Sequence, residues 1–337
     1  MNLQQKKDNS FLATEPLGKL LLKLSLPTVT AQIINMLYNI VDRIYIGHIP
    51  ENGALALTGV GVCMPLIMIV SAFAALVGNG GAPRASIFMG KGDKESAERT
   101  LGNCFTTQII VSLLLTIILF TGNRSFLMAF GASENTLSYA LDYMRIYAFG
   151  TLFVQVTLGM NAFITAQGFA KTGMLSVLIG AVANIILDPI LIFGYFGAPE
   201  LGVAGAAYAT VIGQVVSFVL FVVFQYTCNR EVPAGVRYLI PEGKVMKEIL
   251  SVGFPAIIMQ AVGSFLTYGV NVIFGTLSAS AVTAYGVYYK IQQFAFFAAF
   301  GMNNAMIPVI AFNYGSGDRE RVRAGIRWGM IDTLVIM

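Results

Sequence analysis

Residues 249–289 read ILSVGFPAIIMQAVGSFLTYGVNVIFGTLSASAVTAYGVYY, a stretch in which no side chain is charged. As one α-helix it would measure about 62 Å, twice the roughly 30 Å hydrocarbon core of a bilayer. The stretch must therefore turn back on itself, and the small, polar segment Gly275–Ser280 is the expected turn. These residues predict two successive membrane-spanning helices.

The composition of the whole chain agrees with a membrane protein. Of its 337 residues, 56% are hydrophobic and 11% are charged, and the mean hydropathy is +0.72. Soluble proteins carry about 25% charged residues, so a soluble enzyme and a disordered chain are excluded. A net charge of +4 without a long basic run gives no sign of a nucleic-acid partner.

The residues of common catalytic and metal sites are scarce. The three cysteines are far apart in the sequence and His48 is the only histidine, so neither a disulfide framework nor a zinc site is expected. No Ser–His–Asp, HExxH or phosphate-loop pattern is present. We therefore expect that the chain is not an enzyme and holds no cofactor.

Hydrophobic segments predict eight full spans and part of a ninth, each full span having the roughly 20 residues that crossing requires. The ninth apolar run, 321–337, reaches only about 24 Å, which predicts a chain that is incomplete at its C-terminus. The eight full spans are Leu24–Ile46, Ala54–Pro83, Leu101–Asn123, Ile146–Ala170, Thr172–Phe196, Leu201–Asn229 and two helices between Ile249 and Phe312.

The basic residues predict the orientation. With the N-terminus placed in the cytoplasm, 17 of the 21 Lys and Arg residues fall in cytoplasmic segments. The first ten residues, MNLQQKKDNS, are polar, and the first apolar run is long enough to span, so no cleavable signal peptide is expected.

Two parts of the chain resemble each other. Pro27 corresponds to Pro255, and the Gly-Asp pair at 92–93 corresponds to the pair at 317–318. Six helices separate equivalent points, so the two repeats are expected to be parallel, as in many transporters. We predict a six-helix lobe over 1–226, a cytoplasmic linker over 227–247 and an incomplete second lobe over 248–337. Chance similarity among apolar helices is the alternative.

Asp42 is the first of two acids in predicted spans. A carboxylate at the centre of a membrane helix costs roughly 2.5–3.5 kcal/mol, so such acids are candidates for function. Asp42 ends a polar stripe on one helix face, in which it follows Gln32, Asn35 and Asn39 at helical spacing. The alternative is that Asp42 lies at the membrane interface and pairs with Arg43.

Asp188 is the second acid. It lies one helical turn after Asn184 and directly before Pro189, which removes the hydrogen-bond partner of the Ile185 carbonyl. A carboxylate, an amide oxygen and a free carbonyl are suitable ligands for a hard cation such as Na⁺. The same carboxylate could instead bind a proton, and the non-functional alternative is a kinked helix whose acid bonds a neighbouring helix.

Further polar stripes occur on other predicted helices. Asn161 belongs to one, Tyr143 to a second, Thr210 to a third and Gln260 to a fourth, while Lys290 is the one cation inside the later spans. Such stripes often serve as hydrogen bonds between helices, but several in one bundle favour a shared wet cavity. The expected substrate-cavity residues are Asn35, Asn39, Tyr143, Gln260 and Lys290.

The pattern resembles the multidrug and toxic compound extrusion (MATE) family. The segments that carry the resemblance are LPTVTAQIINMLYNIVDRIYIG (26–47), MGKGD (89–93), NAFITAQG (161–168), NIILDPILIFG (184–194) and GVAGAAYAT (202–210). The resemblance implies a twelve-helix fold in two lobes, of which this chain holds the first and part of the second. It also implies a bacterial inner-membrane exporter that acts as a monomer and exchanges lipophilic, cationic compounds for Na⁺ or H⁺.

By the same resemblance, the cation or proton site of the first lobe consists of Asp42, Asn161, Asn184, Asp188 and Thr210, with Tyr143 nearby. The seventh helix lacks the acid that some branches of the family have. A flippase for lipid-linked precursors, a channel and a non-transporting fragment are the alternatives to an ion-coupled antiporter.

Overall fold

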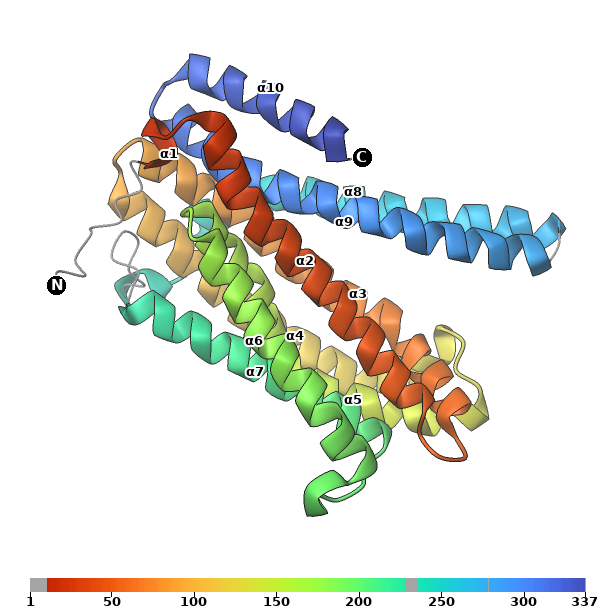
Figure 1. Cartoon of the computed structure of the whole chain (residues 1–337). Coiled ribbons are helices and arrows are strands. Elements are labelled where there is room, and N and C mark those ends of the chain that lie inside the picture. The colour runs from red at the N-terminus through yellow and green to blue at the C-terminus, as the bar shows by residue number, and fades with distance from the viewer. Residues whose placement is uncertain (1–10, 228–235, 278, 337) are drawn as a thin grey trace.

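A computed structural model describes residues 11–227, 236–277 and 279–336, and the elements in these ranges are helical (Figure 1). The elements are α1 (Phe11–Thr14), α2 (Leu17–Gly47), α3 (Gly53–Gly90), α4 (Lys94–Ala129), α5 (Glu134–Ala166), α6 (Ala170–Phe193), the 3₁₀ turn η1 (Tyr195–Gly197), α7 (Val203–Thr227), the 3₁₀ turn η2 (Val236–Leu239), α8 (Gly243–Leu277), α9 (Ala279–Gly315) and α10 (Arg319–Ile336).

The predicted spans are confirmed as helices, although several bounds differ. Helix α5 begins at Glu134 rather than at residue 146, because Asp142 and Arg145 lie within the helix instead of ending it. Helix α6 ends at Phe193 rather than at residue 196, because Gly194 adopts a left-handed conformation with φ 71° that closes the helix. The predicted turn is confirmed, since α8 ends at Leu277 and α9 begins at Ala279.

Seven helices in the described ranges are long and apolar enough to cross a membrane, against eight predicted full spans. Helix α8, which holds the predicted span that starts at Ile249, is not among the seven. They make the chain an all-α, multi-spanning membrane protein. The candidate spans are Leu17–Gly47, Gly53–Gly90, Lys94–Ala129, Glu134–Ala166, Ala170–Phe193, Val203–Gln225 and Ala295–Gly315.

The helices form two groups (Figure 1). Helices α2 to α7 make one bundle, in which α5 packs against α3, α4 and α7. Helices α8 and α9 run side by side and diverge from this bundle, and α1 and α10 lie near the end where the groups meet. At this junction α2 packs on α9 and α3 packs on α8.

The predicted repeat is visible in the backbone. The turn after α3 and the turn after α9 each contain a glycine with positive φ, 77° at Gly92 and 82° at Gly317. In each turn the following aspartate caps the next helix: Asp93 accepts a hydrogen bond from the Ser96 backbone at 3.0 Å, and Asp318 accepts one from the Arg321 backbone at 2.9 Å.

A short helical turn precedes the first long helix of each repeat. These turns are α1 before α2 and η2 before α8. Their similar position could not be read from their sequences, FLAT and VRYL. The boundaries of the predicted linker, 227–247, stay a prediction because part of it lies outside the described residues.

Glycines bring the two groups together at a seam between α3 and α9. A Cβ atom on Gly90 would collide with the carbonyl oxygen of Phe312, and one on Gly315 with that of Ile87. Each of these contacts is the repeat equivalent of the other. Beside the seam, the Thr28 hydroxyl donates a hydrogen bond of 2.7 Å to the Gly301 carbonyl, which ties α2 to α9.

Candidate cation-binding site

The candidate site begins where α6 crosses α7. The crossing depends on two glycines, since a Cβ atom on Gly213 would lie 2.7 Å from the carbonyl oxygen of Gly180. Because the backbones approach so closely, the polar side chains beside the glycines face one another across the crossing. Asn184 lies one turn after Gly180, and Gln214 directly follows Gly213.

Asp188 and Asn184 form the buried end of this arrangement. Asp188 is fully buried and Asn184 is 2% exposed. The Asn184 side-chain amide donates a hydrogen bond of 3.3 Å to Oδ1 of Asp188, which confirms that the i, i+4 spacing places both on one helix face. Pro189 lies inside α6, and the helix continues beyond it to Phe193.

Several side-chain oxygens at and around this pair have no hydrogen-bond partner among the described residues. A buried polar atom without a partner costs free energy, so a cluster of such atoms indicates a place that a ligand can satisfy. The oxygen cluster consists of Asn184 Oδ1 and Asp188 Oδ2 on α6, Asp42 Oδ1 on α2 and Gln214 Oε1 on α7. Asn161 Oδ1 on α5 also lacks a partner, but it lies against Gly173, which is about 20 Å before Asp188 along α6.

Asp42 joins the site from α2. It is 7% exposed, and within the described ranges it makes no close ion pair with Arg43, although Arg43 lies close enough to act on it electrostatically. Asp42 lies close enough to interact electrostatically with Asp188 and with Tyr143. Tyr143 on α5 in turn lies close to Thr210 on α7.

A cavity of about 40 Å³ lies beside the acids. Four predicted site residues line it, Asn35, Asn161, Asn184 and Thr210, whereas Asp42, Asp188 and Tyr143 do not. The complete lining is Asn35, Tyr38, Thr157, Leu158, Asn161, Val177, Gly180, Ala181, Asn184, Thr210, Gly213, Gln214 and Ser217.

Tyr38 was missed by the sequence reasoning. It lines the cavity and lies close enough to interact electrostatically with both Asp42 and Asp188. A tyrosine counts as apolar in a stripe of polar residues, although its position next to Asn39 on the predicted polar face could have identified it.

Three residues predicted for the substrate cavity, Asn39, Gln260 and Lys290, are not among the residues that line this cavity. Asn39 does not line the cavity, because its side-chain amide donates a hydrogen bond of 2.6 Å to the Asn35 carbonyl of its own helix. The side chains of Gln260 and Lys290 lie outside the described residues, so these two assignments stay predictions.

The donor atoms decide what the site can hold. The described residues contain no group of three or more His, Cys, Asp or Glu side chains that could bind a metal ion. What the site offers is two carboxylates surrounded by amide and hydroxyl oxygens, which suits a hard monovalent cation or a proton. Both acids are buried, and a buried anion is stable only if a positive charge accompanies it or a proton neutralises it.

Comparison with known proteins gives the family context. The MatE family model matches residues 27–190 and 255–337. The multidrug export protein MepA of Staphylococcus haemolyticus is 26% identical over 318 residues, which are 94% of this chain and 69% of that protein. MepA of Staphylococcus aureus is 23% identical over 304 residues, 90% of this chain and 66% of that protein. The chain thus spans about two thirds of the length of these relatives.

Solved structures agree in fold. An outward-facing multidrug resistance MATE family transporter of the MOP superfamily superposes with a TM-score of 0.88 at 25% identity, covering 98% of this chain and 72% of that one. A MOP superfamily transporter from Pyrococcus furiosus gives a TM-score of 0.89 at 25% identity with the same coverage.

Proposed function

Because the chain belongs to the MatE family, we propose that it is a secondary active antiporter that exports lipophilic, cationic compounds in exchange for Na⁺ or H⁺. In this proposal the protein lies in the bacterial cytoplasmic membrane with its N-terminus in the cytoplasm. The named relatives, which are multidrug export proteins, support the class of cargo.

The buried oxygens of Asp188, Asn184 and Asp42 carry the proposal of ion coupling. In the folded chain these oxygens are out of contact with water and without partners, so their desolvation has already taken place before an ion arrives. A cation or a proton that neutralises the acids would stabilise the conformation in which α2 and α6 pack closely. Such a ligand therefore favours one conformation over another, which is what coupling requires.

The cargo is expected to bind elsewhere. Pockets for drug-sized molecules measure about 300–1,000 Å³, whereas the cavity beside the acids measures about 40 Å³. Ion and cargo therefore use different volumes, and they compete through conformation rather than by overlap. We expect the cargo to bind where the two groups of helices meet, at the contacts of α2 with α9 and of α3 with α8.

The substitution Asp188→Asn tests the proposal. The chain is reconstituted into liposomes, and uptake of a fluorescent lipophilic cation is followed while a Na⁺ gradient or a pH gradient is imposed separately. In a second measurement, thermal unfolding in detergent is compared in NaCl and in choline chloride. A cation at about 100 times its Kd stabilises a protein by about 2.7 kcal/mol, which such a comparison detects.

We expect Asp188→Asn to abolish gradient-driven uptake and the stabilisation by the coupling ion, because an amide cannot neutralise a cation. Asp142→Asn is the matched control, since Asp142 is an exposed acid on α5 outside the oxygen cluster. Undiminished gradient-driven uptake by Asp188→Asn would remove Asp188 from the mechanism.

A further inference from the structure

Two short helical turns connect the groups of helices where these meet, and the proposed ion site uses neither turn. Helix α1 leads into α2 of the first group, and η2 leads into α8 of the second. Each turn packs on a helix of the other group, α1 on α9 and η2 on α4. The connection is therefore reciprocal, because each group holds the turn that leads into the other.

The backbone of α1 is held by α9 and by α10, which packs on α9. The Leu12 carbonyl accepts a hydrogen bond of 3.0 Å from the Asn313 amide of α9 and one of 3.3 Å from the Arg321 guanidinium of α10. Arg321 also donates to the Glu15 carbonyl. Leu12 and Asn313 are fully buried, so a hydrogen bond lost here is not replaced by one to water.

On its other side, α1 contacts the first group. The Lys23 ammonium of α2 lies 2.7 Å from the Glu15 carboxylate and 4.8 Å from the centre of the Phe11 ring. A Cβ atom on Gly168, in the turn between α5 and α6, would lie 2.4 Å from the Phe11 ring. Helix α1 is thus in contact with both groups at once.

The η2 turn is held by hydrogen bonds from one face of α4. The Thr106 hydroxyl donates to the Leu239 carbonyl at 2.6 Å, and Asn103 Oδ1 accepts from the Glu242 backbone at 2.6 Å. Asn103 is fully buried. The start of the second group is therefore fixed to the first by side chains that bond its backbone, as α1 is fixed to α9.

Charge and close packing add to the attachment of η2. The Arg99 guanidinium of α4 lies 5.8 Å from the centre of the Tyr238 ring and 3.5 Å from the Glu242 carboxylate. Gly102 lets the two backbones touch, since a Cβ atom there would lie 2.4 Å from the Tyr238 carbonyl oxygen. Any larger residue at position 102 would push η2 away from α4.

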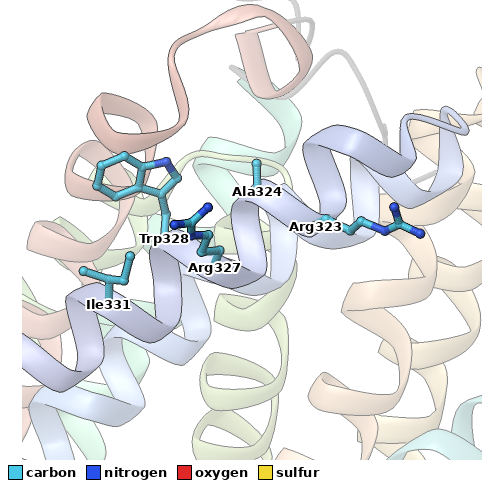
Figure 2. A pocket seen from close by; sticks show the side chains of 5 residues that line it. All are labelled: Arg323, Ala324, Arg327, Trp328 and Ile331. Atoms are coloured by element: carbon cyan, nitrogen blue, oxygen red, sulfur yellow. The ribbon is translucent and has the colours of Figure 1, made fainter.

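The open face of α10 takes no part in the attachment of α1. Figure 2 shows Arg323 and Arg327 pointing away from each other on the surface of this helix, where Trp328 is 47% exposed. Arg321 lies on another side of α10 and reaches α1. The hydrogen bonds to α1 therefore come from one arginine of α10 and from Asn313 of α9.

A proline separates each turn from the long helix that follows it. Pro16 lies between α1 and α2, and Pro241 lies between η2 and α8. Proline has no backbone N–H, so helical hydrogen bonding is interrupted at these positions. Each turn can therefore leave its contacts without unwinding the long helix.

We propose that α1 and η2 are two clasps that keep the cytoplasmic side closed, and that both must release before the groups can part there. The predicted orientation places both turns on that side. The inference rests on the proposed function, because an exporter with alternating access must open to the cytoplasm to admit its cargo. The clasps set the ratio of the closed to the open conformation.

Spin labels on the two groups test the clasps by measuring the distance between the groups. The labels are attached to Lys171→Cys on α6 and Glu320→Cys on α10, two exposed positions. Cys228 is replaced by serine, while Cys63 and Cys104 are buried. The full chain is reconstituted into lipid nanodiscs without an ion gradient or cargo, and pulsed electron paramagnetic resonance gives the populations of the shorter and the longer distance.

Each clasp is weakened by one substitution. Gly102→Ala forces η2 from α4, because the added methyl group meets the Tyr238 carbonyl oxygen. Arg321→Ala removes the hydrogen bonds of α10 to the Leu12 carbonyl. We expect the ratio of the longer to the shorter distance to rise about tenfold in each variant and about a hundredfold in the double variant, since both clasps oppose the same opening.

Matched controls separate this effect from a general loss of stability. Gly205→Ala places a methyl group 2.3 Å from the Leu191 carbonyl oxygen, a contact of α7 with α6 inside the first group. Arg319→Ala removes an exposed arginine of α10. Both controls should leave the distances unchanged, even if Gly205→Ala lowers the unfolding temperature. Unchanged distances in both clasp variants, or an equal change in the controls, overturn the proposal.

The result is independent of the coupling site, because the distance measurement uses neither ion nor cargo. If Asp188→Asn retains gradient-driven uptake, the ion site fails, while a shift of the distances in the clasp variants still supports the clasps. If Asp188→Asn abolishes uptake and the distances do not shift, the ion site stands and the clasps are overturned.

Discussion

Paired glycines bring two helices together both where α6 crosses α7 and where α3 crosses α9. The first crossing borders a polar cavity, whereas the second is a direct contact between backbones. In both, paired glycines let two backbones touch: Gly180 with Gly213 in the first, Gly90 with Gly315 in the second. The neighbours of the glycines differ. Beside the first pair stand Asn184, Gln214 and Ser217, whereas the second pair meets the backbone of Ile87 and Phe312.

The difference shows that glycine determines only how closely helices approach. The side chains one turn away determine whether the contact holds a ligand or seals an interface. The first crossing lies within the first group of helices and carries the proposed ion chemistry. The second joins the two groups through contacts of the glycines with the opposing backbone.

The largest effect is expected from Gly90→Ala at the seam. The added methyl group meets a carbonyl oxygen of the opposing backbone, which has no side chain that can move away. Overpacking of this kind costs about 1–3 kcal/mol, so thermal unfolding in detergent should occur at a clearly lower temperature. Gly61→Ala is the control on the same helix, because a Cβ atom there meets nothing within 4 Å. Equal stability of the two variants would show that the seam is loosely packed.

A smaller effect is expected from Asn184→Ala at the polar crossing. The substitution removes an amide oxygen of the cluster and the hydrogen bond to Asp188. Affinity for the coupling ion, measured as ion-dependent thermal stabilisation, should fall about tenfold, or about 1.4 kcal/mol. Asn39→Ala should leave that affinity unchanged, since Asn39 bonds its own helix. The reverse order of effects would place the ion site nearer to α2 than the oxygen cluster indicates.

Thr28→Val should weaken the contact between α2 and α9 by about 1 kcal/mol, the typical contribution of one buried hydrogen bond. The valine keeps the size of the side chain but leaves the Gly301 carbonyl without its donor. Thr58→Val is the comparison, because the exposed Thr58 hydroxyl bonds only the Ala54 carbonyl of its own helix. A matched loss of unfolding temperature in both variants would indicate that the hydrogen bond between α2 and α9 adds nothing to the contact of the two groups.

The smallest effect is expected from the turn that leads out of the seam. The hydrogen bond with Ser96 lowers the pKa of Asp93, so folding favours the ionised carboxylate. The contribution is therefore present at neutral pH and is lost as the pH falls below the ordinary aspartate value of about 3.9. Asp93→Asn keeps the cap without a titrating group, and its unfolding temperature should approach that of the unaltered chain as the pH is lowered. A constant difference between the two proteins would argue against a titrating cap.

Much of the fold followed from the sequence because lipid imposes simple rules. A long uncharged run in lipid must be helical and must be long enough to cross the bilayer. A run twice as long as the bilayer is thick must turn back, and this rule located the turn between α8 and α9. Helix ends were less accessible. Charged residues such as Asp142 and Arg145 lie inside α5, so the uncharged run was shorter than the helix.

For the candidate site, helical spacing identified which residues share a face, as with Asn184 and Asp188. It could not show which faces meet, because that depends on how α6 crosses α7 at two glycines with no polar side chain of their own. Asn39 illustrates the limit, since it has the right spacing and yet uses its amide within α2.

The size of the cavity beside the acids has a consequence for selectivity. A cavity needs about 10–15 Å³ to hold one water molecule, and this one measures about 40 Å³. It therefore has room for more than one water molecule, so an ion that binds beside it would keep part of its hydration shell. Discrimination between ions would then depend less on the energy of shedding water than on how the amide oxygens of Asn184 and Gln214 order the water that stays.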